Sequence, residues 1–328
     1  MLMAKNIQTA KIKLKPTDEV EIISLVDNSI DILSTPSNPQ VQPFWQWVKP
    51  QPKQNSHSKL PLAEHGFSML VRLFNGETRE TFLFDTGGSA NTIKENAKIM
   101  GLNLGEIGFV VLSHGHYDHF GGLLSVIDAV EKKRLPIIVH EDMFKPRGTA
   151  SRIGTIREYP KFPNQTKLES AKLILTKKPH LAANEHVCIT GEIPRKTSFE
   201  KGLANQRTLV DGVWQPDPLI VDDRAVVINI KDKGLLVLSG CAHAGIINTI
   251  NYAIEITGIS TVYAVFGGFH LAGRGFEDRI ESTIAELIRV KPSLVAPSHC
   301  TGWRAILAIS QAFPDSFVWN SVGNLYRL

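Results

Sequence analysis

Short apolar runs along the chain end repeatedly in segments rich in Gly, His and Asp. The run 109–112 leads directly into His114, and the run 235–238 leads into Cys241 and His243. Strands that end in this way and are followed by helical stretches are typical of α/β folds, in which loops at strand ends hold the reactive side chains. The pattern predicts strands over 20–26, 67–74, 81–84, 109–112, 137–140, 225–230, 235–238, 261–266 and 294–296, and helices over 91–100, 123–134, 245–257, 278–290 and 303–313.

Three segments lack this regular pattern. Residues 1–16 are lysine-rich and predict a flexible basic tail, which leaves 17–328 as a single domain. Residues 34–61 are rich in Pro, Gln, Asn and Ser and predict a long loop, and residues 141–223 predict an insertion on the domain. The loop contains an aromatic cluster, which we expect to pack on the protein's own surface rather than to close over a ligand: Phe44, Trp45 and Trp47.

Composition narrows the class of protein. The 328 residues are 43% hydrophobic and 21% charged, as in ordinary globular proteins, and the net charge of +4 is too small to indicate nucleic-acid or membrane binding. The three cysteines are far apart and form no C-x-x-C pair, so a disulfide framework is not indicated and we expect a cytoplasmic location. No apolar stretch approaches the ~18 residues of a membrane span.

The densest cluster of metal-ligand residue types follows the predicted strand 109–112. Residues 114–119 have the sequence HGHYDH, which places three imidazoles and a carboxylate in one short loop. These donors suit zinc, with manganese or iron as alternatives. Four donors in one loop would crowd a single ion, so we expect two neighbouring divalent ions. The ligands predicted here are His114, His116, Asp118 and His119.

Two motifs resemble those of a known family. Residues 110–122, VVLSHGHYDHFGG, resemble the signature loop of the metallo-β-lactamase superfamily, and Asp85 in the motif FDTG (84–87) resembles the strand-end Asp of that superfamily. The resemblance implies an αββα sandwich, in which two mixed sheets lie face to face with helices outside and metals at one edge. The order of strands, loops and helices predicted above agrees with that architecture.

A narrower resemblance extends over most of the chain. It rests on six motifs found in order, and they resemble the branch of the superfamily typified by 7,8-dihydropterin-6-methyl-4-(β-D-ribofuranosyl)-aminobenzene-5'-phosphate synthase. Many members of this branch are known only as metal-dependent hydrolases without an assigned substrate. The motifs are VDN (26–28), AEHGFS (63–68), TGEIPR (190–195), SGCAHAGIIN (239–248), GGFHL (267–271) and HCTG (299–302).

The superfamily pattern implies further ligands: another His, a bridging Asp or Cys, and a final His. His299 follows a predicted strand and resembles the final His. The chain departs from the commonest pattern after the strand 235–238, where Cys241 stands in place of the bridging Asp. Cys241 is therefore either a thiolate ligand or a buried packing residue. His243, two residues on, is the favoured mid-chain ligand, because residues i and i+2 of an extended stretch share a face.

Three further residues are candidates for substrate contact. His270 follows a strand and two glycines, and we expect it to contact substrate or to donate a proton. His65 has a similar position beside Glu64, and Arg195 lies in a family-like segment where it could meet an anion. Asp118 and His270 are the predicted catalytic residues.

These observations predict a metal-dependent, hydrolase-like enzyme. Metal-activated hydroxide would attack a small anionic substrate that carries phosphate. The first alternative is a transferase that joins a dihydropterin diphosphate to a ribosyl-aminobenzene phosphate, and the second is a non-catalytic metal-binding module. The expected partner is a small molecule, with no nucleic acid or membrane, and a homo-oligomer is possible.

Overall fold

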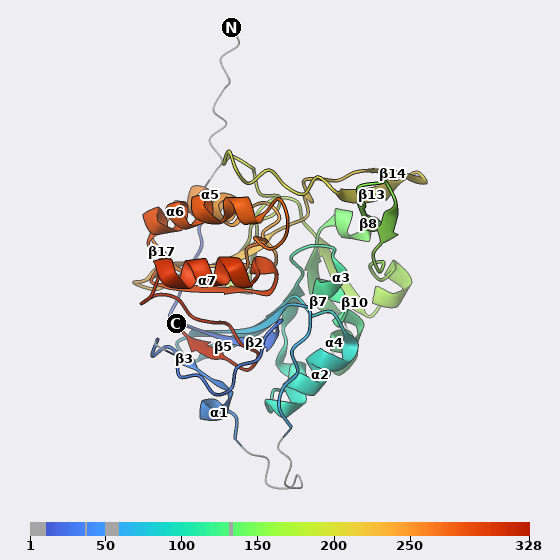
Figure 1. Ribbon diagram of the computed structural model, residues 1–328. Coiled ribbons are helices and arrows are strands. Elements are labelled where there is room, and N and C mark those ends of the chain that lie inside the picture. Colours follow the sequence, from blue (N-terminus) through green and yellow to red (C-terminus); the bar gives the residue numbers. More distant parts are fainter. Residues whose placement is uncertain (1–10, 37, 50–58, 131–133) are drawn as a thin grey trace.

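Two β-sheets stacked face to face form the centre of the computed structural model, which describes residues 11–36, 38–49, 59–130 and 134–328 (Figure 1). Within these residues, the eight-stranded sheet has the order β10 (Ala171–Leu175), β7 (Leu135–Val139), β6 (Phe109–Val111), β5 (Thr78–Phe84), β4 (Ser68–Asn75), β2 (Glu19–Val26), β19 (Leu325–Arg327) and β3 (Val41–Gln42). The seven-stranded sheet has the order β11 (His180–Ala182), β12 (Val187–Ile189), β15 (Ala225–Ile230), β16 (Gly234–Ser239), β17 (Val262–Gly268) and β18 (Leu294–Ser298), with β1 (Pro16–Thr17) beside β15.

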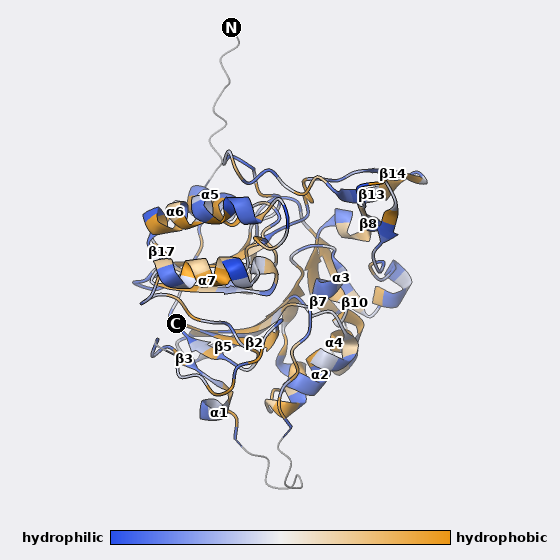
Figure 2. Ribbon diagram, viewed as in Figure 1, coloured by the Kyte–Doolittle hydropathy of each residue, from blue (hydrophilic) through white to orange (hydrophobic). Residues whose placement is uncertain are grey.

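The central strands are buried on both faces, which explains why their sequences are almost continuously apolar. In β2, Ile22 faces the core between the two sheets, whereas its neighbour Ile23 faces the helices outside. In β16, Leu236 likewise faces the core between the two sheets, and Leu235 faces the helices outside. Successive side chains of a strand point to opposite faces, so a sheet covered on both sides needs apolar residues at every position. In Figure 2, much of the sheet region between the helices is orange, the colour of hydrophobic residues.

Helices cover the outer face of each sheet. On the eight-stranded sheet lie α2 (Ala90–Ile99) and α4 (Leu123–Val130), and on the seven-stranded sheet lie α5 (Ile246–Thr257), α6 (Ile280–Val290) and α7 (Trp303–Ala312) (Figure 1). The predicted αββα sandwich is therefore confirmed. No helix among the described residues is long and apolar enough to cross a membrane.

The segment 141–223 is only partly an insertion. Its strand β10 pairs with β7, β12 pairs with β15, and β11 pairs with β12, so these three strands belong to the two central sheets. The remainder forms a separate four-stranded sheet at one end of the sandwich, here called the accessory sheet (Figure 1). Its strands are β14 (Val213–Pro216), β13 (Gln206–Val210), β8 (Arg147–Ala150) and β9 (Ile156–Glu158).

The other two irregular segments pack on the domain where the structure describes them. Of the predicted tail, residues 1–10 lie outside the described residues, but Leu14 is buried and β1 pairs with β15, so 11–16 is not a free tail. In the predicted loop 34–61, of which 37 and 50–58 lie outside the described residues, Phe44 begins the short helix α1 (Phe44–Trp47) and is buried in the core. The Trp47 indole N–H donates to the Gly323 carbonyl. Phe44 and Trp47 therefore pack on the protein itself, as expected, whereas Trp45 is 46% exposed.

Candidate metal centre

Asp85 fixes the start of the His-rich loop. This fully buried residue directly follows β5 and has a positive φ of 59°. Its Oδ1 accepts the Ser113 backbone N–H at 2.6 Å, and its Oδ2 accepts the Ser113 hydroxyl at 2.7 Å. The same Oδ2 lies 2.6 Å from Nδ1 of His119. The carboxylate therefore fixes the imidazole so that its other nitrogen, Nε2, points away into the site, an arrangement common around metal-binding histidines.

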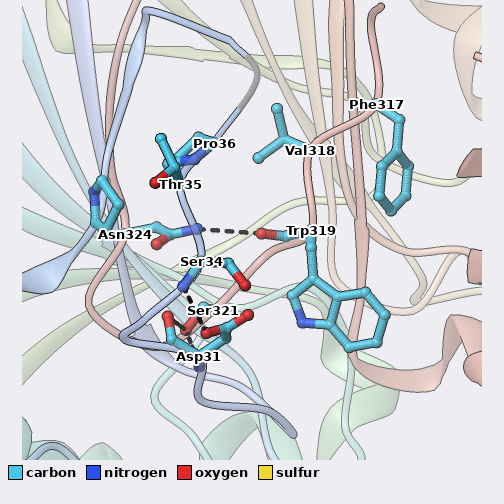
Figure 3. A pocket seen from close by; sticks show the side chains of 10 residues that line it. Asp31, Ser34, Thr35, Pro36, Phe317, Val318, Trp319, Ser321 and Asn324 are labelled. Carbon is cyan, nitrogen blue, oxygen red and sulfur yellow. Dashed lines mark hydrogen bonds between the residues drawn. The ribbon is translucent and has the colours of Figure 1, made fainter. Parts of the chain in front are cut away.

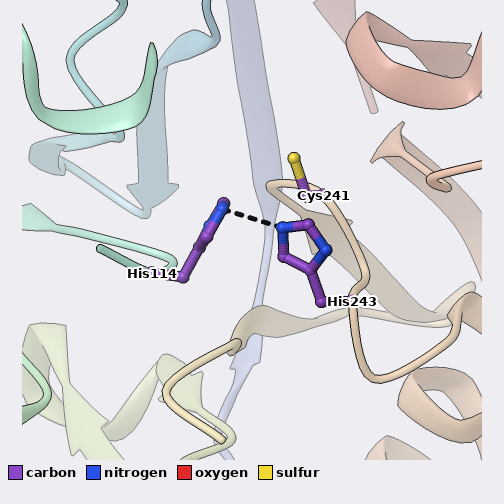
Figure 4. A group of neighbouring side chains, drawn as sticks. All are labelled: His114, Cys241 and His243. Carbon is purple, nitrogen blue, oxygen red and sulfur yellow. Dashed lines mark hydrogen bonds between the residues drawn. The ribbon is translucent and has the colours of Figure 1, made fainter. Parts of the chain in front are cut away.

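Three imidazole nitrogens converge at one point, here called the three-nitrogen group. Nε2 of His114 lies 3.0 Å from Nδ1 of His116, and Nε2 of His243 lies 3.0 Å and 3.2 Å from these two atoms. Figure 4 shows His114 and His243 facing each other across the site. Each neutral imidazole has one N–H and one acceptor nitrogen, so three nitrogens that are all mutually close cannot all be hydrogen-bonded to one another. They do fit three ligands of one divalent ion.

Burial keeps these imidazoles neutral. It lowers the pKa of His114 and of His243 well below the ordinary value, assisted by the neighbouring imidazoles, and it lowers the pKa of His116 to about 3. Neutral imidazole is the form that binds metal. The group is therefore ready to accept a cation at neutral pH.

A second set of donors surrounds Asp118, in the short helix α3 (Tyr117–Phe120). Its Oδ2 lies 3.3 Å from Nε2 of His299, 3.4 Å from Nε2 of His65 and 3.8 Å from Nε2 of His119. Burial raises the pKa of Asp118, but His119 and His299 outweigh burial and hold it well below the usual range. In the same pair, burial lowers the pKa of His299, yet Asp118 and other acidic neighbours raise it to about 9.

The sulfur of Cys241 is common to both sets. It lies 3.1 Å from Nε2 of His119, and within 4.8 Å of the donor atoms of His114 and His243 on one side and of His299 on the other. Cys241 therefore occupies the position between the two sets where a bridging Asp was expected. Burial raises the pKa of its thiol well above the ordinary value, so in the absence of a cation the thiol stays protonated.

Both central sheets contribute to this centre. The loop after β6 provides the residues 114–119, the loop after β16 provides Cys241 and His243, and the end of β18 provides His299. The strands β16, β17 and β18 are parallel, so their carboxyl ends meet at one edge. The predicted metal ligands are thus brought together at the seam between the sheets.

Apart from Asp85, sequence reasoning missed the groups that orient these ligands. Asp27 accepts the backbone N–H of His299 at 2.9 Å, and Asn28 Oδ1 lies 3.0 Å from the Nδ1 of that histidine. Asp222 accepts the N–H of Gly115 at 2.8 Å. The motif VDN (26–28) contained a signal for the first two, but nothing in the local sequence marked Asp222.

A pocket of about 270 Å³ opens beside the centre and is roofed by residues of the accessory sheet. His65 and His270 both line it, and the His270 ring lies 4.5 Å from the His243 ring. Arg195 is not among its lining residues, and its guanidinium donates instead to the carbonyls of Ile193 and Leu219. The lining residues are His65, His116, Tyr117, Asp118, Thr149, Arg157, Tyr159, Leu203, Asn205, Gln206, His243, His270 and Phe276.

A second cavity, of about 210 Å³, lies elsewhere, between the segment 31–36 and the segment 317–324 (Figure 3). Its polar groups satisfy one another: Asp31 accepts the Ser34 N–H at 3.0 Å, and the Asn324 amide donates to the Trp319 carbonyl at 3.1 Å. None of the predicted ligands lines it. This cavity therefore lies apart from the candidate metal centre.

Sequence comparisons identify relatives of the chain. The family model of the metallo-beta-lactamase superfamily matches residues 63–197. The chain is 31% identical over 278 residues to the 7,8-dihydropterin-6-methyl-4-(beta-D-ribofuranosyl)-aminobenzene-5'-phosphate synthase of Methanocaldococcus jannaschii, a match that covers 81% of this chain and 90% of the synthase. It is also 31% identical to an uncharacterized protein of the same organism, over 83% of this chain and 96% of that protein.

Solved structures share the fold. One, described as a metal-dependent hydrolase of the beta-lactamase superfamily, superposes with a TM-score of 0.69 and 23% identity, covering 94% of this chain and 98% of that chain. A metallo-beta-lactamase fold protein from Bacillus subtilis has a TM-score of 0.50 and 13% identity, covering 95% and 100%. Proteins of this superfamily generally bind divalent metals, and the donor set described above fits such ions. The chain is an enzyme of the metallo-β-lactamase superfamily.

Proposed function

We propose that the chain is a binuclear metallohydrolase that acts on a small anionic substrate bearing phosphate. One ion would be held by His114, His116 and His243, and the other by Asp118, His119 and His299, with Cys241 between them. The observation that carries this proposal is the three-nitrogen group, whose mutual distances of 3.0–3.2 Å fit a shared cation and not a hydrogen-bond network. Zinc is the first choice because imidazole and thiolate are its preferred donors.

The residues of the chain divide the work of such a reaction. Bound divalent ions make water acidic near neutral pH and stabilise developing negative charge on oxygen. Asp118, held ionised by two imidazoles, accepts a hydrogen bond from the attacking water and so orients it. His270 lines the pocket with an Nδ1 that lacks a partner among the described residues, and it donates a proton to the leaving group. His65, whose Nε2 lies 3.4 Å from Asp118, contacts the substrate from the pocket wall.

A transferase is the second candidate. The 31% identity to the synthase, over nine-tenths of that protein, supports it directly. In this alternative, the same centre holds a diphosphate leaving group while an aryl nucleophile, rather than water, displaces it. The third possibility, a metal-binding module without catalysis, receives no support from these relatives.

The test combines metal analysis with turnover. Protein purified without added metal is analysed by mass spectrometry and assayed on phosphodiesters, lactones, thioesters and dihydropterin diphosphates. We expect about two divalent ions per chain, and His116→Ala should lose both metal and turnover. The matched control is His180→Ala, which removes an imidazole in β11, outside the pocket. Full turnover in His116→Ala would refute the proposal. Release of diphosphate only when an aryl amine is present would favour the transferase.

A further inference from the structure

The accessory sheet contributes one arginine side chain to the pocket lining. Arg157, in β9, is the only Lys or Arg among the residues that line it. Among the described residues, no carboxylate oxygen lies within 4 Å of its guanidinium. By contrast, the nearby Arg147 is held by Asp222 and Arg195 by two carbonyls. Arg157 is thus the arginine of the pocket lining, and its donors are not held by a carboxylate.

An aromatic wall connects Arg157 to the metal centre. Its guanidinium lies 5.8 Å from the centre of the Tyr159 ring, and that ring meets the His116 ring edge-on at 5.4 Å. Gln206 donates a hydrogen bond to the Tyr159 hydroxyl at 3.2 Å and so helps to fix the ring. His116 belongs to the three-nitrogen group. One face of the pocket therefore extends from the Arg157 guanidinium, across the Tyr159 ring, to the candidate metal centre.

We propose that Arg157 forms an anion subsite, which binds the phosphate of an aromatic substrate whose ring lies against Tyr159. The planar guanidinium presents paired N–H donors that match phosphate oxygens, and arginine is the residue best suited to this recognition. An aromatic ring beside the guanidinium offers a flat surface for a second ring. Arg157 is then a specificity-determining residue of the accessory sheet. This inference rests on the proposed function and specifies its substrate class.

The experiment uses phenyl phosphate as the probe and benzyl alcohol as the neutral comparison. Binding is measured by titration calorimetry on the full chain, both loaded with zinc and stripped with chelator, because zinc itself binds phosphate. Arg157→Gln should weaken phenyl phosphate binding roughly 10- to 100-fold in both forms, which is the range for a charged hydrogen bond. The affinity of Arg157→Lys should lie between those of the wild type and Arg157→Gln, because lysine keeps the positive charge but lacks the paired N–H donors of the guanidinium.

The matched control is Arg152→Gln, an exposed arginine near the β8–β9 turn that does not line the pocket. It should leave binding within twofold of the wild type. Undetectable binding of phenyl phosphate to the wild type, or equal binding by wild type and Arg157→Gln, would overturn the subsite. If the protein holds no metal but Arg157→Gln still weakens binding, the proposed function fails and the subsite stands. If metal and turnover are present and Arg157→Gln binds phenyl phosphate as the wild type does, the proposed function stands and the subsite fails.

Discussion

The ion pair between Arg147 and Asp222 connects the accessory sheet to the metal-binding loop. Asp222 is fully buried and Arg147 is 4% exposed. The two side chains form a bidentate pair with distances of 2.8 Å and 2.5 Å, and Asp222 also accepts the Gly115 N–H at 2.8 Å. Burial raises the pKa of Asp222, but Arg147 outweighs burial and holds it below the ordinary value. Asp222 is therefore ionised at neutral pH.

We predict that Asp222→Asn lowers the free energy of unfolding by up to about 3–5 kcal/mol, because it removes the bidentate partner of the buried Arg147 and leaves only Asp217, whose Oδ2 lies 3.6 Å from the Arg147 Nε. Asparagine keeps an acceptor oxygen for Gly115, so the substitution isolates the charge. That loss is a large part of the ~5–15 kcal/mol that typically stabilises a protein. The double variant Arg147→Met/Asp222→Asn should recover much of it, since it also removes the buried guanidinium that has lost its bidentate partner.

The assay is urea unfolding followed by circular dichroism, with the slopes compared so that a change in stability is not confused with a change in the unfolded state. Glu286→Gln is the control, because its partner Arg289 is exposed and such surface pairs contribute at most about 1 kcal/mol. The pH dependence has a definite sign. Because the folded pKa is lowered, the stabilisation is present above the ordinary carboxyl pKa and disappears as pH falls through the folded value. A loss under about 1 kcal/mol in Asp222→Asn would refute the reasoning.

Three further predictions concern single side chains: a support of a metal ligand, a candidate ligand and a buried thiol of the core. Asp85→Asn should reduce metal affinity about 10- to 100-fold by freeing the His119 ring, as measured by competition with a chelator; unchanged affinity would contradict a role in orientation. Cys241→Ser should abolish the sulfur-to-metal charge-transfer absorption of the cobalt-substituted protein, and its persistence with unchanged metal stoichiometry would make Cys241 a packing residue. Burial raises the pKa of Cys188 to about 12, so this thiol should not react with a disulfide reagent at pH 8 until the protein is unfolded in urea; rapid modification of the folded protein would contradict that burial.

The central sheets could be predicted from sequence because their strands are buried on both faces. Residues 20–26 and 235–238 are nearly all apolar, and the structure has β2 and β16 at these positions. The donors in 114–119 were also predictable, because they are adjacent in sequence. The proximity of Cys241 and His299 to them was expected only from family resemblance, since pairing of distant loops is not encoded in any local pattern.

The accessory sheet could not be predicted, and the physical reason lies in its strands. β9 has three residues, two of them exposed, and β14 has four that are all exposed or half-buried. Such strands have no buried face to impose an alternation of apolar and polar residues. Arg157 was consequently overlooked, and Arg195, which lies in a recognisable motif, was chosen instead. The structure places Arg157 in the pocket lining and Arg195 outside it.

The seam between the sheets has a consequence for the order of assembly. His119 and Cys241 are separated by 122 positions in the chain, yet their donor atoms lie 3.1 Å apart. Closing a loop of that length in a random coil costs about 4 kcal/mol in entropy from its length dependence alone. In the unfolded chain, a metal ion would therefore bind only the local donors of 114–119. The complete set of ligands would come together only after the two halves of the sandwich have packed against each other.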